Sequence, residues 1–257
     1  MRIAFTRMNL IKSNTLQAFH LGPNIPAGGS ALATASPPGQ NAVMHRLSFH
    51  GETLHLLPSG GLSWPARKLI AVSDLHLGKS ERLARRGGTL LPPYETQATL
   101  EKLDCDLEAT KAETVVCLGD SFDDLAAAEG IDARSRLCLM RLMAGRDWSW
   151  ITGNHDPGPI EIGGTHRAEL KLKPFTFRHI ADPPEKAEIS GHYHPKARLA
   201  GQTKPCFLAD AARLILPAYG TYTGGLRAHD PVLAALMATD ALAILTGPRV
   251  LAIPMPR

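Results

Sequence analysis

The strongest constraint on the fold of this chain is a set of apolar runs that each end in a short polar cluster. Three of them, "RKLIAVSDLH", "ETVVCLGD" and "DWSWITGNHD", have the composition of strands buried on both faces of a parallel sheet. Helical periodicity separates the runs, over residues 94–109 and 132–144. We predict that the first helix buries a stripe of Leu100, Leu103 and Leu107. The predicted stripe of the second helix is Ala133, Leu137, Met140 and Ala144. We predict an α/β fold, βαβαβ at first and mostly short strands after Leu170.

Metal-competent side chains occupy the ends of the predicted strands. Residues at the carboxyl ends of adjacent parallel strands converge at one edge of a sheet. In Asp-x-His and His-x-His, the two outer side chains point to the same face, because a strand repeats every two residues. We therefore expect one cavity lined by all of these clusters. They are Asp74 and His76, Asp120 and Asp123, Asn154, His155 and Asp156, then His179, and finally His192 and His194.

The donor atoms in these clusters indicate a catalytic metal site. Carboxylate, imidazole and amide oxygen without thiolate suit Mn²⁺, Fe or Zn²⁺ better than a structural zinc. The clusters hold too many candidate ligands for one ion, but enough for two ions that share a carboxylate. The four cysteines contain no CxxC pair, which excludes a zinc ribbon and argues against a disulfide framework. We interpret them as the reduced thiols of an intracellular protein.

The N-terminal segment differs in composition from the rest of the 257 residues. Residues 1–51 contain four basic and no acidic residues, whereas the remainder contains 24 of each. This balance excludes a globally basic nucleic-acid-binding surface but permits a local basic patch. Residues 1–43 are predicted to be a disordered extension or the product of a misassigned start, with Met44 as the natural start. An organelle transit peptide is less favoured, because a helical Arg-rich face is missing.

Residues 44–257 are then expected to form a single domain, since no linker or internal repeat divides them. No stretch has the composition of a transmembrane helix, and the most apolar one, residues 232–253, is interrupted by charged residues and a Gly-Pro turn. We therefore expect a cytoplasmic protein with no membrane partner.

The polar clusters also follow one another in a recognisable order. "SDLHLG", "GDSFD", "GNHD", a lone histidine and "GHYH" resemble the five motifs of the calcineurin-like metallophosphoesterase superfamily. The resemblance implies a four-layer αββα sandwich with a dinuclear metal centre between its two sheets. The implied ligands are Asp74, His76 and His194 for one ion, Asn154, His179 and His192 for the other, and Asp120 as the bridge between them.

The same resemblance implies a mechanism. The metals would activate a bridging hydroxide that attacks the phosphorus in line. His155 would be the general acid or transition-state stabiliser, oriented by Asp123. His179 is the least specific of the ligand assignments, with His166 as the alternative.

Two further segments resemble one branch of that superfamily. "DLHLGKSERLARRGG" places Lys79, Arg82, Arg85 and Arg86 after the first motif as a candidate nucleic-acid-binding track, the alternative being a solvated charged face. "CFLADAARLILPAYGTYTGG" ends in an aromatic, glycine-rich loop that could reach the cleft.

Together with "GHYHPKARL", these segments resemble the ligase-associated DNA-damage-response endonucleases. This branch implies a Mn²⁺-dependent phosphodiesterase or endonuclease acting on single-stranded or flapped DNA in bacterial repair, alongside a DNA ligase, an exonuclease and a helicase. Asp123 departs from the histidine expected in this branch, which bears on how His155 is oriented.

Two alternatives remain open at this point. One is a phosphoesterase of the same fold that acts on a small substrate, either a nucleotide pyrophosphatase or a phosphoprotein phosphatase. The short motif spacings leave little room for the cap that many such enzymes insert. The other is a non-catalytic repair scaffold, which is disfavoured because all seven ligands are present.

Overall fold

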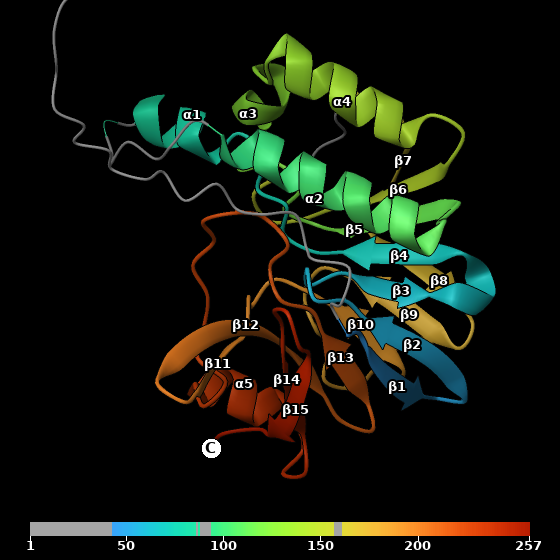
Figure 1. Cartoon of the computed structure of the whole chain (residues 1–257), viewed down its shortest axis with the longest axis vertical. Helices are drawn as coiled ribbons and strands as arrows, with labels where there is room; N and C mark the ends of the chain where they lie inside the picture. Colours follow the sequence, from blue (N-terminus) through green and yellow to red (C-terminus); the bar gives the residue numbers. More distant parts are fainter. Residues whose placement is uncertain (1–42, 86, 88–93, 157–160) are drawn as a thin grey trace, which may run out of the picture. The chain divides into compact units, whose positions relative to one another are not determined.

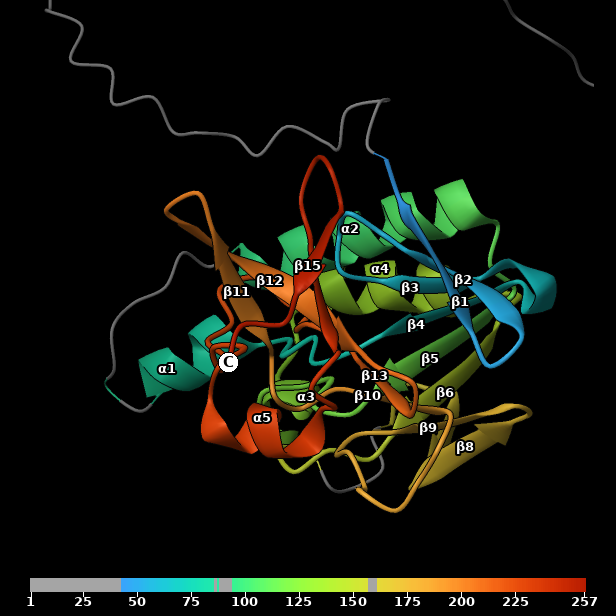
Figure 2. The same cartoon turned by 90° about the horizontal axis from the view of Figure 1, so that it is seen from below.

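The computed structural model of this protein describes residues 43–85, 87, 94–156 and 161–257 (Figures 1 and 2). The N-terminal extension predicted over residues 1–43 lies outside the described residues except for its last residue. From residue 43 onward the chain forms two β-sheets that pack face to face, with helices on their outer faces. This arrangement confirms the predicted α/β class and the four-layer αββα sandwich.

The first sheet has seven strands in the order β1-β2-β3-β4-β5-β6-β7. Its antiparallel part comprises β1 (His45–Phe49), β2 (Glu52–Leu56) and β3 (Leu62–Trp64), and the short helix η1 (Pro65–Arg67) leads from β3 into the parallel part. The parallel strands are β4 (Leu69–Val72), β5 (Thr114–Leu118), β6 (Asp147–Ile151) and β7 (Thr165–Arg167). The strands β4, β5 and β6 are the three predicted apolar runs, and each ends at its polar cluster.

Helices α2 and α4 cover the outer face of this sheet (Figure 1). The helices of this half are α1 (Lys79–Arg85), α2 (Glu95–Thr110), α3 (Leu125–Glu129) and α4 (Ala133–Met143). The predicted stripe of α2 is confirmed, because Leu100, Leu103 and Leu107 are buried against β4 and β5.

The predicted stripe of α4 is wrong. Leu137 and Met140 are 67% and 50% exposed, whereas Leu139 and Leu142 are fully buried. Cys138 and Met143 flank these two leucines and pack against the same cluster, so this face offers the sheet a wider apolar surface than the predicted stripe.

The second sheet places its parallel strands at the centre and antiparallel strands toward both edges. Its order is β15-β14-β12-β13-β10-β9-β8, with β11 paired to β12. Strands β9 (Phe175–Arg178), β10 (Glu188–Ser190) and β13 (Arg213–Ile215) are parallel. The remaining strands are β8 (Glu169–Leu172), β11 (Lys196–Leu199), β12 (Gln202–Ala209), β14 (Leu242–Leu245) and β15 (Leu251–Pro254).

A continuous apolar core joins the two sheets. Leu54 and Val116 of the first sheet pack in one cluster with Phe177, Ile189 and Phe207 of the second. The outermost layer on the second sheet is thin, because its helix α5 (Pro231–Leu236) is short and buries only Leu233. In Figure 1, α1 and α3 lie above the two sheets and α5 lies below them.

The four cysteines are free thiols, and Cys117 and Cys206 are buried in the core. Among the helices of the described residues, none combines the length and the apolar character needed to span a lipid bilayer.

Candidate metal centre

All of the predicted ligands lie where a strand of one sheet or the other has just ended. The clusters after β4, β5 and β6 come from the first sheet, and those after β9 and β10 come from the second. The described residues contain three groups whose candidate ligand atoms lie within 4.8 Å of one another, of which two consist of predicted ligands and the third joins His76 to Asp123 and His155. The first group is Asp74, His76 and His194, and the second group is Asp120, His179 and His192.

The seventh predicted ligand, Asn154, adjoins the second group. Its side-chain oxygen Oδ1 lies 3.0 Å from Nε2 of His179. His166, the alternative to His179, instead lies in β7 with its ring stacked on Trp150 at 6.5 Å between centroids. His166 is not a member of the two groups among the described residues. The structure therefore brings together all seven residues that the sequence indicated. Of the two alternative histidines, His179 and not His166 lies beside Asn154 in this cluster.

The two groups lie against each other. Nε2 of His179 is 3.2 Å from Nδ1 of His192 and 3.4 Å from Oδ2 of Asp120. Across the boundary, Nδ1 of His179 is 3.9 Å from Oδ1 of Asp74. The main-chain N–H of His192 donates to the other oxygen of Asp74, at 2.9 Å. The geometry therefore joins the two groups through direct contacts.

Buried polar atoms in the first group fit a bound cation. Oδ1 of Asp74, Nε2 of His76 and Nε2 of His194 have no hydrogen-bond partner among the described residues. Buried polar atoms are nearly always satisfied, because an unpaired one loses its hydration without compensation. The Asp74 oxygen is 3.1 Å from the His194 nitrogen, a separation that allows both to bind one ion. Together with the oxygen and imidazole donors, this arrangement suits a divalent metal.

A hydrogen bond orients one imidazole ring of the site, and a close approach to a carboxylate orients another. Nδ1 of His179 donates to the carbonyl oxygen of Leu118 at 2.7 Å, which leaves Nε2 as the nitrogen able to bind a metal. Nδ1 of His76 lies 2.9 Å from Oδ1 of Asp123, so Nε2 of His76 is directed away from that carboxylate. A partner on the far nitrogen is the usual arrangement of a metal-binding histidine.

The electrostatics keep both carboxylates of the site ionised. Burial raises the pKa of Asp120, but the interactions with His179 and with the N–H of His155 outweigh burial and bring this pKa down to about 2. Burial also opposes ionisation of Asp74, whereas His194 and His179 lower its pKa below the usual range. Burial and the neighbouring His179 lower the pKa of His192, which favours its neutral, ligand-competent form.

Five of the seven candidate ligands have left-handed backbone conformations. Residues other than glycine rarely adopt a positive φ, and such positions cluster at functional sites. The five are Asp74 (φ 53°), His76 (45°), Asp120 (45°), His192 (71°) and His194 (47°). The local backbone thus supports the assignment of these positions to a functional site.

Two glycines allow the clusters to approach one another. Gly119 has φ +79°, and a Cβ atom there would lie 2.4 Å from Nδ1 of His179. A Cβ on Gly191 would lie 1.6 Å from Oγ of Ser73. Larger residues at these positions would separate the ligands that follow them.

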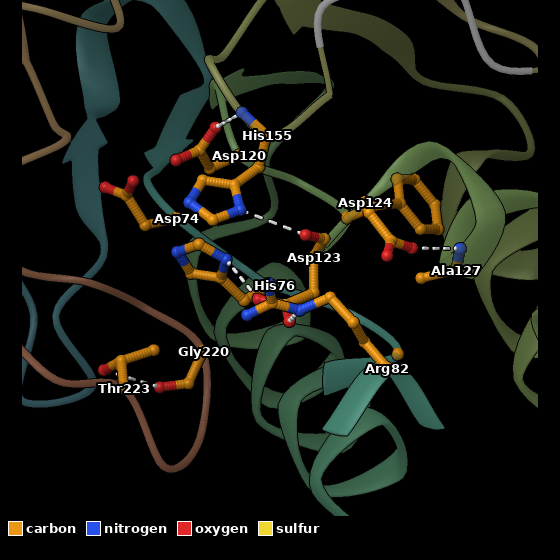
Figure 3. A network of polar contacts seen from close by, with 12 residues as sticks. Asp74, His76, Arg82, Asp120, Asp123, Asp124, Ala127, His155, Gly220 and Thr223 are labelled. Atoms are coloured by element: carbon orange, nitrogen blue, oxygen red, sulfur yellow. Dashed lines mark hydrogen bonds and ion pairs between the residues drawn. The ribbon is translucent and has the colours of Figure 1, made fainter. Parts of the chain in front are cut away.

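Asp123 contacts the site through different atoms than expected (Figure 3). Its carboxylate faces Nδ1 of His76 and the Nε–H of Arg82. Its main-chain carbonyl, not its carboxylate, lies 3.0 Å from Nδ1 of His155. Asp123 therefore holds a candidate ligand and touches His155 only through the backbone.

Replacing Asp123 with asparagine is expected to weaken Mn²⁺ binding by about 10- to 100-fold, because the charge that orients His76 is lost while the side-chain shape is kept. Titration calorimetry on metal-free protein measures the affinity. Asp240→Asn, at an exposed position, is the matched control. Equal affinity in wild type and the Asp123 variant would show that this carboxylate does not support the metal centre.

Two residues to which the sequence assigned no individual role hold the clusters in place. The buried carboxylate of Asp156 accepts from the N–H groups of Ser121 (2.7 Å) and Phe122 (3.2 Å), which ties the "GNHD" turn to the "GDSFD" loop. The Ser73 hydroxyl donates to Oδ2 of Asp74. The only signal for either was its position inside a motif, next to a predicted ligand.

The predicted basic track is described only in part. Lys79 begins α1, and Nε of Arg82 donates to Asp123, so the Arg82 side chain is just 18% exposed. The side chain of Arg85 and the whole of Arg86 lie outside the described residues. One basic residue that was not predicted, Lys196, adjoins the track. Burial and the nearby charge of Lys79 both lower the pKa of Lys196.

A cavity of about 370 Å³ opens beside the second group. It is lined by Thr152, Gly153, Asn154, Ala168, Glu169, Arg178, His179 and Ile180. The cavity gives a ligand direct access to Asn154 and His179.

Comparison with known proteins shows a likeness to a solved nuclease structure. No protein-family model matches this sequence, and no curated protein matches it. Among solved structures, the nuclease MPE of Pseudomonas putida superimposes with a TM-score of 0.66 at 28% sequence identity. The match covers 82% of this chain and 100% of that chain. Over most of its length, the chain is therefore similar in sequence and in fold to a bacterial nuclease.

Proposed function

We propose that this chain is a metal-dependent nuclease that hydrolyses phosphodiester bonds in DNA. The observation that carries the proposal is the direct contact of Asp74, in the first ligand group, with His179 and with the main-chain N–H of His192, both in the second. Two adjoining groups of carboxylate and imidazole are what a pair of neighbouring divalent cations requires. The likeness to a nuclease of known structure supports the same class of substrate.

In this proposal Asp74, His76 and His194 hold one ion, and Asn154, His179 and His192 hold the other. Asp120 bridges the two. Two bound cations would polarise the phosphoryl oxygens and lower the pKa of a water molecule between them, so that it can attack phosphorus. Mn²⁺ is the proposed metal, because the sequence resemblance implies it.

The chain itself contributes a proton donor. The main-chain N–H of His155 donates to Oδ1 of Asp120 at 2.8 Å, which places the residue beside the proposed bridge (Figure 3). Its Nδ1 faces the carbonyl of Asp123, so Nε2 is the nitrogen left for the substrate. A protonated Nε2 can donate to the leaving oxygen as the ester bond breaks.

Finer features of the proposal rest on the sequence resemblance. We infer that the substrate is single-stranded or flapped DNA and that the protein acts in bacterial DNA repair, in the cytoplasm, with a DNA ligase, an exonuclease and a helicase. A small-substrate phosphoesterase is the second candidate, favoured by the cavity beside Asn154 and His179, which has the size of a small-ligand site.

Hydrolysis of bis-p-nitrophenyl phosphate and of a labelled single-stranded oligonucleotide, each with Mn²⁺ and with excess chelator, tests the proposal. We expect both to be cleaved with Mn²⁺ and neither with chelator. Cleavage of the small diester with an intact oligonucleotide would favour the second candidate. Failure on both substrates, with metal bound, would favour the scaffold interpretation.

A further inference from the structure

A loop between β13 and α5 lies directly against the first ligand group. The N–H groups of Tyr219 and Gly220 donate to the carbonyl oxygens of Ser73 (2.7 Å) and Asp74 (3.0 Å). A Cβ on Gly225 would lie 2.0 Å from the carbonyl oxygen of His194. Figure 3 shows Gly220 and Thr223 of this loop beside Asp74 and His76. The loop, residues 219–225, is therefore one wall of the candidate metal centre.

Side-chain contacts anchor this loop along its length. The Tyr219 hydroxyl donates to Oδ2 of Asp106 at 2.8 Å, and its ring is fully buried. The N–H of Thr221 donates to Oγ1 of Thr99 at 3.1 Å. The carbonyl oxygen of Thr223 accepts from Nζ of Lys196 at 2.8 Å. The chain on both sides of Tyr222 is thus fixed to the fold.

Tyr222 itself projects from the anchored loop. Its side chain is 53% exposed, and its backbone is left-handed, with φ 58°. A positive φ is a genuine outlier for so bulky a residue, and such conformations persist only where the surroundings enforce them. An exposed aromatic ring at an enforced position beside a metal centre is suited to contact a ligand.

A positive charge adjoins the loop at Lys196. The Lys196 side chain is half-buried and donates to the carbonyl oxygen of Thr223, and the charge of Lys79, at the start of α1, lowers the pKa of Lys196. Within the part of the chain that the structure describes, no carboxylate pairs with either ammonium group. An aromatic face next to unpaired cations is the arrangement by which proteins bind single-stranded nucleic acid.

We propose that Tyr222 stacks on one unpaired base of a single-stranded nucleic acid, while Lys196 binds the phosphate next to that base. This inference rests on the proposed nuclease function and specifies its substrate: a strand that passes the first ligand group with its bases unstacked. A base inside a duplex is already stacked on both faces and cannot bind Tyr222 in this way. The site therefore selects single strands and unpaired ends over duplex.

Binding to a normal and to an abasic oligonucleotide separates the two parts of the proposal. Fluorescence anisotropy, measured with Mn²⁺ in an Asp120→Asn background, reports affinity without cleavage. Tyr222→Ala is expected to weaken binding of the normal strand by about 5- to 150-fold and to leave the abasic strand unaffected. Tyr222→Phe, which keeps the ring, should restore the affinity, and Tyr222→Leu should not.

Lys196→Ala should weaken binding of both strands and reduce the slope of affinity against salt by about 1. Lys186→Ala removes the same charge from an exposed position before β10, at the other end of that strand from His192, and is the matched control. Unchanged affinity of Tyr222→Ala for the normal strand would overturn the stacking role. An oligonucleotide that wild-type protein leaves intact would instead overturn the proposed function.

Discussion

Replacing Asp120 with asparagine is expected to lower the rate of phosphodiester hydrolysis by at least about 10²- to 10³-fold, because one preorganised charge is removed from the centre of the site. The carboxylate belongs to the second ligand group, with Oδ1 accepting from the N–H of His155 and Oδ2 3.4 Å from Nε2 of His179. Asparagine has the same shape, and its amide oxygen can still accept from His155. The fold should therefore survive while the negative charge between the two proposed ions is lost.

Rates on bis-p-nitrophenyl phosphate, together with the metal content of each variant, measure this effect. Asp240→Asn makes the same chemical change at an exposed position and should retain wild-type activity. Circular dichroism and thermal melting show whether the variant is folded. Turnover close to wild type in a fully metal-loaded Asp120→Asn protein would count against the bridging assignment.

The second large effect is expected from His155→Ala, and its size should depend on the leaving group. Loss of a positioned general acid costs about 10²- to 10⁴-fold when the leaving oxygen must be protonated. The sugar oxygen released from DNA is such a leaving group. Nitrophenolate needs little protonation, so the same variant should hydrolyse bis-p-nitrophenyl phosphate with a much smaller loss.

Single-turnover rates with saturating substrate compare the two reactions free of binding effects. His229→Ala, at an exposed histidine after the last motif, serves as the control. Equal losses on the oligonucleotide and on the nitrophenyl ester would rule out proton donation by His155. In that case the ring would act through the shape or charge of the site.

The ligand positions could be predicted from the sequence because their signal is local. Asp74, His76 and Asp120 each follow an apolar run whose length and composition already indicate a buried strand, and parallel strands bring their ends together. The fold class follows from the same runs and from the helical periods between them. The buried face of α2 could also be predicted from the sequence, because its three leucines lie at helical spacing and no other face of that helix is as apolar.

The remaining features depend on contacts between distant segments, which no local pattern contains. Two apolar stripes compete on α4, and only the depth of burial against the sheet decides between them. The "GDSFD" motif identifies Asp123, but the approach of His76 and Arg82 determines that its carboxylate supports a ligand. Likewise, the position of Lys196 beside Lys79 results from packing of the second sheet against the loop after β4.

The left-handed conformation of five candidate ligands lowers the stability of the fold at the positions that its activity requires. Each such position costs about 1–2 kcal/mol in a residue that carries a Cβ, and glycine would avoid that cost. Selection for thermal stability alone would thus remove the ligands one at a time, with the sandwich core untouched. The family of sequences able to adopt this fold is consequently larger than the family able to bind metal, and the inert members should be the harder ones to melt.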